Sequence, residues 1–206
     1  MLKRFLTFRA LAKGAGGSGG GSIDSFIDGT ITEINSNAAR VGAYGVYQRK
    51  NLEKVTMPEL TRIEQYGFAG CSAIEEFYVP KLKSTGNRAF YSCKNLRSIN
   101  VESAEGFAIQ AFQGCTSLEK IDLPSIKEFS RGAFEDCSAL TTVIFRPETM
   151  VSVSGGDIFS NTPIANGTGY VYVPSALVDT YKQSGDWTTY ANQFRAIEDY
   201  PEITGG

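Results

Sequence analysis

Residues 111–124 read AFQGCTSLEKIDLP, and the same pattern returns along the chain at a constant interval. Its cysteine is one of four, and neighbouring cysteines lie 22 residues apart: Cys71, Cys93, Cys115 and Cys137. Self-similarity at a fixed period of about 20–50 residues is typical of proteins built from stacked repeats. The interval therefore predicts a repeat architecture with one structural unit per 22 residues.

The positions around each cysteine repeat as well. A phenylalanine comes three residues before every cysteine, and Leu or Ile comes three residues after it. In the quoted unit Ile121 and Leu123 alternate with polar residues, which is typical of a strand with one buried face, and Pro124 ends that strand. A unit this short cannot bury its apolar side alone, whereas stacked units bury a continuous core. The columns expected in this core are Phe68, Phe90, Phe112 and Phe134 with Ile74, Leu96, Leu118 and Leu140.

The pattern A-F-x-x-C-x-x-L-x-x-I-x-L-P resembles the leucine-rich repeats of the BspA-like class. It begins at Ala111 and recurs with changes from Phe68, Phe90 and Phe134, so the resemblance covers residues 41–150 strongly and 23–40 weakly. The segment YVYVP at 170–174 resembles the closing segment of that family. The resemblance implies a leucine-rich-repeat solenoid of short parallel strands, stacked one per 22-residue coil, with a small helical C-terminal cap. It leaves function open, since such repeats are implied in adhesion, host binding and phage structural proteins alike.

The repeat departs from its pattern at both ends. The first unit has Val46 and Arg49 where later units have Phe and Cys, and the third has Glu102 in place of Pro. After residue 150 the register breaks, because Phe159 comes three residues late for the Phe column. Such deviation is expected of terminal repeats, which must shield the core from water.

The C-terminal part predicts two short helical pieces that close the last coil. Ser175 follows Pro174 and is placed to cap a helix, and Asp186 is placed to cap a second turn. The side chains expected to seal the core are Leu177, Tyr181, Trp187 and Phe194.

Composition favours a folded, non-enzymatic protein. The chain has 206 residues, of which 42% are hydrophobic and 20% charged, and this balance is that of a globular domain. Its net charge of −2 favours neither nucleic acid nor a membrane surface as partner of the whole chain. The sequence contains no His, which removes the commonest general base and metal ligand. We therefore expect no enzymatic activity and no cofactor.

The chain divides into four parts. Residues 1–13 form a basic apolar arm, 14–22 a Gly/Ser linker, 23–150 the solenoid, and 151–206 the final coil and cap. The arm is predicted to anchor the protein to protein partners in a larger assembly; a membrane-surface helix and a disordered tail are the alternatives. The linker is either natural or the scar of an engineered fusion. The expected anchor residues are Leu2, Phe5, Leu6, Phe8 and Leu11.

The layout of arm, linker and module suggests where the protein acts. The sequence has no apolar stretch long enough to span a membrane, and its first residues lack the uninterrupted apolar core of a secretory signal. We expect a phage virion component, such as a tail, fibre or head-decoration protein, which displays the solenoid for surface recognition. The alternative is a bacterial cell-surface adhesin or host-interaction protein.

The cysteines could be metal ligands or buried core residues, and the glycine-rich segment could be a phosphate-binding loop or a linker. Zinc sites use closely spaced cysteine pairs, whereas every interval here is 22 residues, so the spacing favours a ladder of free buried thiols over a metal site. The glycine-rich segment lacks the Gly-Lys-Ser/Thr ending of a phosphate-binding loop, which favours the linker.

A column of variable residues alternates with the buried strand positions. In a solenoid such a column forms an extended exposed surface suited to binding, here of a cell-surface protein or glycan. Charged neighbours such as Lys54 and Glu76 add mixed charge, and an ordinary solvated face is the alternative. The predicted partner-binding face is Thr56, Tyr78, Asn100, Asp122 and Ile144.

Overall fold

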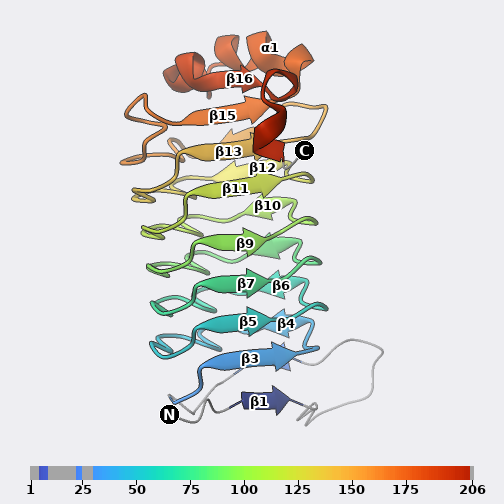
Figure 1. Cartoon of the computed structure of the whole chain (residues 1–206), viewed down its shortest axis with the longest axis vertical. Coiled ribbons are helices and arrows are strands. Elements are labelled where there is room, and N and C mark those ends of the chain that lie inside the picture. Colours follow the sequence, from blue (N-terminus) through green and yellow to red (C-terminus); the bar gives the residue numbers. More distant parts are fainter. Residues whose placement is uncertain (1–4, 9–21, 25–29, 205–206) are drawn as a thin grey trace.

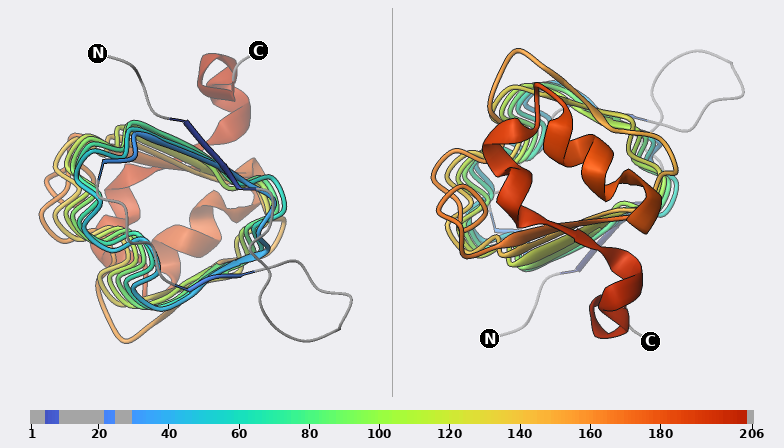
Figure 2. Two further views of the ribbon diagram at one scale, coloured as in Figure 1. Left: turned by 90° about the horizontal axis from the view of Figure 1, so that it is seen from below. Right: turned by 90° about the horizontal axis from the view of Figure 1, so that it is seen from above.

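The chain winds into a single stack of coils, seen in a computed structural model that describes residues 5–8, 22–24 and 30–204. Figure 1 shows the coils one above the other, with the N-terminal strand at one end and helical turns at the other. Each complete coil contributes a strand to a front sheet and a strand to a rear sheet. Figure 2 shows these sheets facing each other across the interior, with helical turns over one end. The predicted leucine-rich-repeat solenoid is thus confirmed.

All strand pairs in the described residues are parallel, as a coil that repeats in one direction requires. The front sheet runs in the order β1-β3-β5-β7-β9, and β11 lies next to β9 and begins the order β11-β13-β15-β16. The rear sheet runs in the order β2-β4-β6-β8-β10-β12-β14. Front strands are β1 (Phe5–Phe8), β3 (Glu33–Ser36), β5 (Lys54–Thr56), β7 (Glu76–Tyr78), β9 (Ser98–Asn100), β11 (Lys120–Leu123), β13 (Thr142–Phe145), β15 (Tyr170–Val173) and β16 (Phe194–Ala196). Rear strands are β2 (Ser22–Ile23), β4 (Arg40–Val41), β6 (Arg62–Ile63), β8 (Ser84–Thr85), β10 (Gly106–Phe107), β12 (Glu128–Ser130) and β14 (Ser152–Ser154).

The pairing register places equivalent residues of successive coils directly over each other. Val55 pairs with Phe77, which pairs with Ile99 in the front sheet. On the rear side Val41 pairs with Ile63. Because the side-chain period of a strand is two residues, this register sends the same columns inward in every coil.

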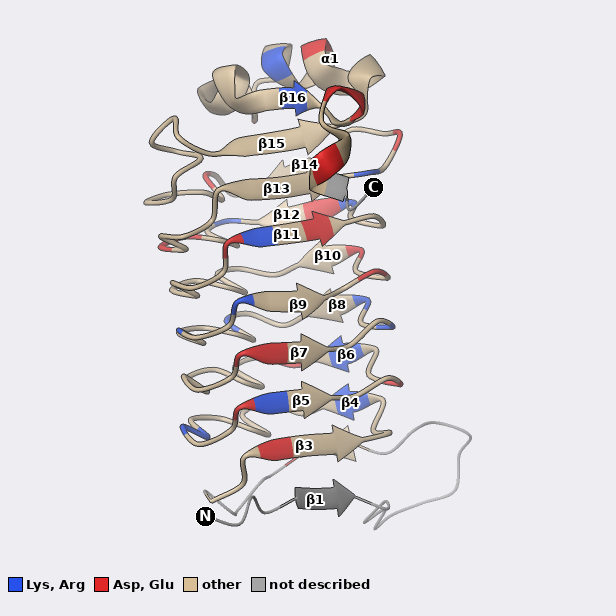
Figure 3. Cartoon of the chain, in the orientation of Figure 1, with Lys and Arg blue, Asp and Glu red and all other residues tan. Residues whose placement is uncertain are grey.

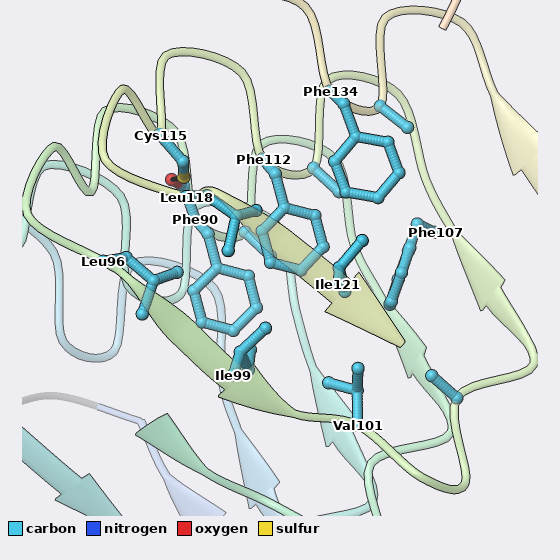
Figure 4. Close-up of a cluster of buried hydrophobic side chains, with 14 of the residues drawn as sticks. Phe90, Leu96, Ile99, Val101, Phe107, Phe112, Cys115, Leu118, Ile121 and Phe134 are labelled. Carbon is cyan, nitrogen blue, oxygen red and sulfur yellow. Dashed lines mark hydrogen bonds between the residues drawn. The ribbon is translucent and has the colours of Figure 1, made fainter. Parts of the chain in front are cut away.

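The phenylalanine column forms the centre of the core, as Figure 4 shows. The Phe90 and Phe112 rings stack with centroids 4.9 Å apart, and Phe112 and Phe134 follow at 5.4 Å. Phe159 continues the column and stacks on Phe134 at 5.9 Å, although it comes three residues late in the sequence. Two of the three extra residues precede β14, because β11 and β13 pair at an interval of 22 residues whereas Glu128 pairs with Ser152. The third lies between β14 and Phe159, and the ring keeps its place in the column.

The cysteine ladder is buried, and its thiols are free, as the spacing predicts. Each sulfur donates a hydrogen bond to a backbone carbonyl 25 residues earlier: Cys93 Sγ to Phe68 at 3.2 Å, Cys115 Sγ to Phe90 at 3.2 Å. Burial raises the pKa of Cys71 and of Cys137 to about 12 and that of the two inner thiols well above its ordinary value. The thiols therefore stay protonated at neutral pH, and their role is to join neighbouring coils.

The C-terminal end is closed by aromatic side chains. The indole of Trp187 lies 5.7 Å from the Phe145 ring and donates to the Val151 carbonyl at 3.0 Å. Tyr181 and Phe194 are buried beside it, while Leu177 is half-buried against the core. The helical elements are η1 (Ser175–Leu177), α1 (Val178–Gln183), η2 (Thr188–Gln193), η3 (Ile197–Asp199) and η4 (Pro201–Thr204).

The predicted capping role of Ser175 is wrong. The first helical turn starts at Ser175 itself, and no side chain caps it. The backbone amide of Ser175 instead donates to the Glu198 carboxylate at 3.0 Å. The orphan amide at this helix start is thus satisfied from a segment 23 residues later.

The N-terminal arm contributes a strand where the sequence suggested a helix. β1 pairs in parallel with β3, with Phe5 opposite Glu33 and Phe8 opposite Ser36. Of the expected anchor residues, Leu2 and Leu11 lie outside the described residues, as does the linker apart from Ser22.

We predict that the free energy of unfolding falls by about 3–5 kcal/mol in Phe112→Ala, because this ring is fully buried between two others. The exposed control Glu119→Ala should change it by less than about 0.5 kcal/mol. Urea denaturation of both variants measures the difference. Similar stabilities would contradict the stacked core.

A second prediction concerns alkaline pH. The folded-state pKa of the thiols lies above the ordinary value of 9.0, so their contribution to stability is complete below about pH 9 and is lost as pH rises toward about 12. Each thiol contributes at most about 1.4 kcal/mol per pH unit in that window. Urea denaturation from pH 8 to 11 should show a shallower decline for Cys115→Ser than for the parent chain. Equal slopes would mean that Cys115 ionises freely in the folded state.

Candidate partner-binding face

An open groove lies on the outer face of the front sheet, along β5, β7 and β9. Alternate residues of each strand point away from the core, and the parallel register aligns them in columns. The groove has a volume of about 540 Å³. Its lining residues are Lys54, Val55, Thr56, Glu76, Phe77, Tyr78, Ser98, Ile99 and Asn100.

The structure brings three of the predicted face residues together in this groove. Thr56 pairs with Tyr78, and Tyr78 pairs with Asn100, so the three side chains form one column across neighbouring strands. Tyr78 is the most prominent, with 48% of its surface exposed, while Thr56 and Asn100 are half-buried. A side chain of this type, apolar in its ring and polar at its tip, is common at the centre of protein interfaces.

Ile144 is not part of the exposed face, and its prediction as a face residue is wrong. It is fully buried. Lys120 in β11 donates a hydrogen bond to the Ile203 carbonyl, and Tyr172 in β15 packs against the Tyr200 ring at 5.3 Å. The C-terminal segment 197–204 thus contacts the strands on both sides of β13. Figure 2 shows this segment outside the outline of the coils, beside the front sheet.

Asp122 lies at the border between the open groove and the covered part of the face. Its half-buried carboxylate accepts three hydrogen bonds from the Arg146 guanidinium, two from Nε at 2.8 and 3.1 Å and one from Nη2 at 2.6 Å. These bonds raise the pKa of Arg146. Asp122 is therefore already engaged within the chain.

The charges at the groove form an exposed pair. Lys54 Nζ lies 2.7 Å from the Glu76 carboxylate. Their hydrogen bond raises the pKa of Lys54 and lowers that of Glu76. Both side chains are at least half exposed, so water and salt screen the attraction and leave both groups open to exchange for a partner's charges.

Metal ligands do not gather in the described part of the groove. Within the part of the chain that the structure describes, no group of three or more His, Cys, Asp or Glu side chains is placed to hold a metal ion. The four cysteines are buried in the core and do not face the groove. Among the same residues, no helix has the length and apolar character needed to cross a bilayer.

Parallel-stranded coils that repeat every 22 residues, with apolar residues at the same positions, are typical of a leucine-rich-repeat protein. The family model of the BspA type leucine-rich repeat region matches residues 39–165 in six copies, which is more than half of the chain. The protein belongs to this family. Comparison with curated proteins gave no match.

Among the solved structures that match, one with a TM-score of 0.50 supports the fold. A leucine-rich repeat protein of T. pallidum is 21% identical, with a TM-score of 0.50 over 82% of this chain and 85% of its own. A leucine-rich repeat protein from Bacteroides ovatus is 17% identical, with a TM-score of 0.44 over 74% of this chain and 58% of its own. A leucine rich cell surface protein from Faecalibacterium prausnitzii is 14% identical, with a TM-score of 0.31 over 66% and 58%. At these identities the likeness concerns the fold alone.

We predict that ending the chain at Ala196 uncovers the apolar surface around Ile144 and Tyr172, because the contacts of residues 197–204 are lost. Fluorescence of a dye that binds exposed apolar surface should increase. A chain that ends at Thr204 keeps the segment and serves as the control. Unchanged dye binding in the shorter chain would show that the segment does not shield this surface.

Proposed function

We propose that this protein is a non-enzymatic binding protein whose front groove receives a segment of a partner protein. The observation that supports this proposal is the column of Thr56, Tyr78 and Asn100 in the groove. The parallel pairing of β5, β7 and β9 aligns these three residues. Thr56 and Tyr78 are firmly placed because β5 and β7 are paired on both sides, and β9, which carries Asn100, is paired with β7. A preorganised surface loses little conformational freedom on binding.

The C-terminal segment supports a polypeptide as the occupant. Residues 197–204 already lie on the same sheet face, two coils beyond β9, and use a ring contact and a side-chain to backbone hydrogen bond to do so. The front face of this solenoid therefore accommodates a short segment of chain, here with two 3-10 helical turns. The groove over β5, β7 and β9 offers the same kind of contacts, with Tyr78 as the aromatic group and Lys54 as the long cationic donor.

The proposed setting is a phage virion, with the N-terminal arm as the anchor and the solenoid displayed outward. The basic apolar composition of residues 1–13 and the Gly/Ser linker after them support this arrangement. A bacterial cell surface is the alternative, and it would use the same groove. Deleting residues 1–13 tests the anchor: loss of the protein from purified particles supports it, and normal incorporation contradicts it.

The groove is tested by placing a photo-crosslinking benzoylphenylalanine at Tyr78 and irradiating the protein with a host envelope extract. We expect a crosslinked protein product from position 78 and none from Thr116, an exposed control position on a turn. Excess parent protein should compete, whereas Tyr78→Ala with Asn100→Ala should compete about tenfold more weakly, as loss of an aromatic hot spot implies. Equal competition by the double variant would contradict the groove as the binding site.

A further inference from the structure

A second surface lies on the turns that lead from the rear sheet to the front sheet. Three consecutive turns, residues 44–51, 66–73 and 88–95, bring aromatic and cationic side chains together at this edge. We call these residues the turn-edge cluster. Its members are Tyr44, Tyr47, Tyr66, Arg88 and Tyr91.

The cluster is continuous from coil to coil. Tyr44 stacks on Tyr66 with ring centroids 5.0 Å apart and planes 15° apart, and Tyr47 meets Tyr44 edge-on at 5.4 Å. The Arg88 guanidinium donates to the Tyr66 hydroxyl at 2.6 Å. It also lies 5.8 Å from the ring centres of Tyr66 and Tyr91.

The core does not require these side chains. Tyr44 is 52% exposed and Tyr91 38% exposed, while the other members are half-buried. Tyr44, Tyr66 and Arg88 each have a positive φ, at 57°, 55° and 55°. Bulky residues rarely adopt this conformation, which Gly or Asn adopts more easily. Gln110 and Gly132, at the same position of the next two coils, also have a positive φ, so the turn itself imposes this conformation. At 44 and 66 the turn carries tyrosines there, which places their rings at its surface.

The first and the third of these turns are cationic, and the second, residues 66–73, has no charged side chain. The three turns contain four Lys or Arg and no Asp or Glu: Arg49, Lys50, Arg88 and Lys94. Glu64, which lies just before the second turn, is paired with Arg40 at 3.2 Å and Arg62 at 2.7 Å. Farther along the same edge, the turn 132–139 carries Glu135 and Asp136 instead. Figure 3 shows this change of sign along the turns, from blue at the level of β5 and β9 to red near β11.

The backbone of these turns has few groups left for a ligand. The amides of Tyr44, Val46 and Gln48 donate to Gln65, Gly67 and Ala69 at 2.8–3.1 Å. The next turn repeats the arrangement, with Tyr66 donating to Asn87 and Phe68 to Ala89. A bound molecule therefore meets rings, hydroxyls and cations, and gains little from the main-chain pairing that favours extended peptides.

We propose that the turn-edge cluster binds an acidic polysaccharide. Tyrosine rings offer flat apolar faces and edges to the C–H faces of sugar rings, and their hydroxyls exchange hydrogen bonds with sugar hydroxyls. The exposed Lys50 and Lys94 supply charge-assisted hydrogen bonds to carboxylate or sulfate groups. Arg88, whose Nε and Nη1 already donate to Gln110 and Tyr66, adds positive charge beside the rings. This site is separate from the front groove and does not depend on the function proposed for it.

Binding of the full chain to immobilised dextran sulfate tests the proposal, with uncharged dextran and polyglutamate as parallel probes. We expect dextran sulfate to bind more tightly than both. Tyr44→Asn with Tyr66→Asn removes two rings and keeps a residue type that tolerates positive φ. This variant should bind about tenfold more weakly, as loss of stacking by two rings implies. Tyr78→Asn, in the front groove, is the matched control and should bind as the parent does.

Charge reversal provides a second test that does not disturb the rings. Lys50→Glu with Lys94→Glu changes exposed side chains only, so the fold should persist and dextran sulfate binding should fall and lose much of its salt dependence. Tight binding of polyglutamate would assign the surface to acidic polypeptides and overturn the proposal. Full binding by the double Tyr variant, or no binding of dextran sulfate at low salt, would overturn it as well.

Discussion

The stacking of one coil directly on the next is the constraint on which the rest of the molecule depends. Rings such as Phe90 and Phe112 stack with centroids 4.9 Å apart because consecutive coils keep the same register. Parallel strand pairs and thiol-to-carbonyl hydrogen bonds reinforce that register on either side of the rings. The outward-facing residues inherit the same alignment, because strand side chains alternate between the core and the surface.

This alignment explains why one fold presents two different surfaces. On the front face the strands align Thr56, Tyr78 and Asn100 in a groove. On the turns the same repeat aligns Tyr44 and Tyr66, so that their rings stack between coils. The core columns stay apolar from coil to coil since they must pack on each other, whereas the outer columns are free to vary. The outer columns can therefore change without loss of the stacked core.

The C-terminal end adds a constraint of its own. Trp187 and Tyr181 cover the last rings of the core, and the chain then turns back along the outside of the front sheet. The contact between Tyr172 and Tyr200 shows that this return segment packs against the sheet. It leaves the outer face open along β5, β7 and β9 and covered toward the C-terminal end, which sets one limit of the groove.

The sequence alone determined the solenoid, its core columns and the buried thiols, because each follows from a short pattern repeated at one interval. It also placed Thr56, Tyr78 and Asn100 in one column for the same reason. Only the tertiary structure decided which part of that column stays exposed: Ile144 is buried beneath residues from more than 50 positions later. Likewise, the amide of Ser175 finds its acceptor in Glu198. A repeated pattern can be read from the sequence directly. Which surface residues are covered depends on where a distant, non-repeating segment packs in the folded chain.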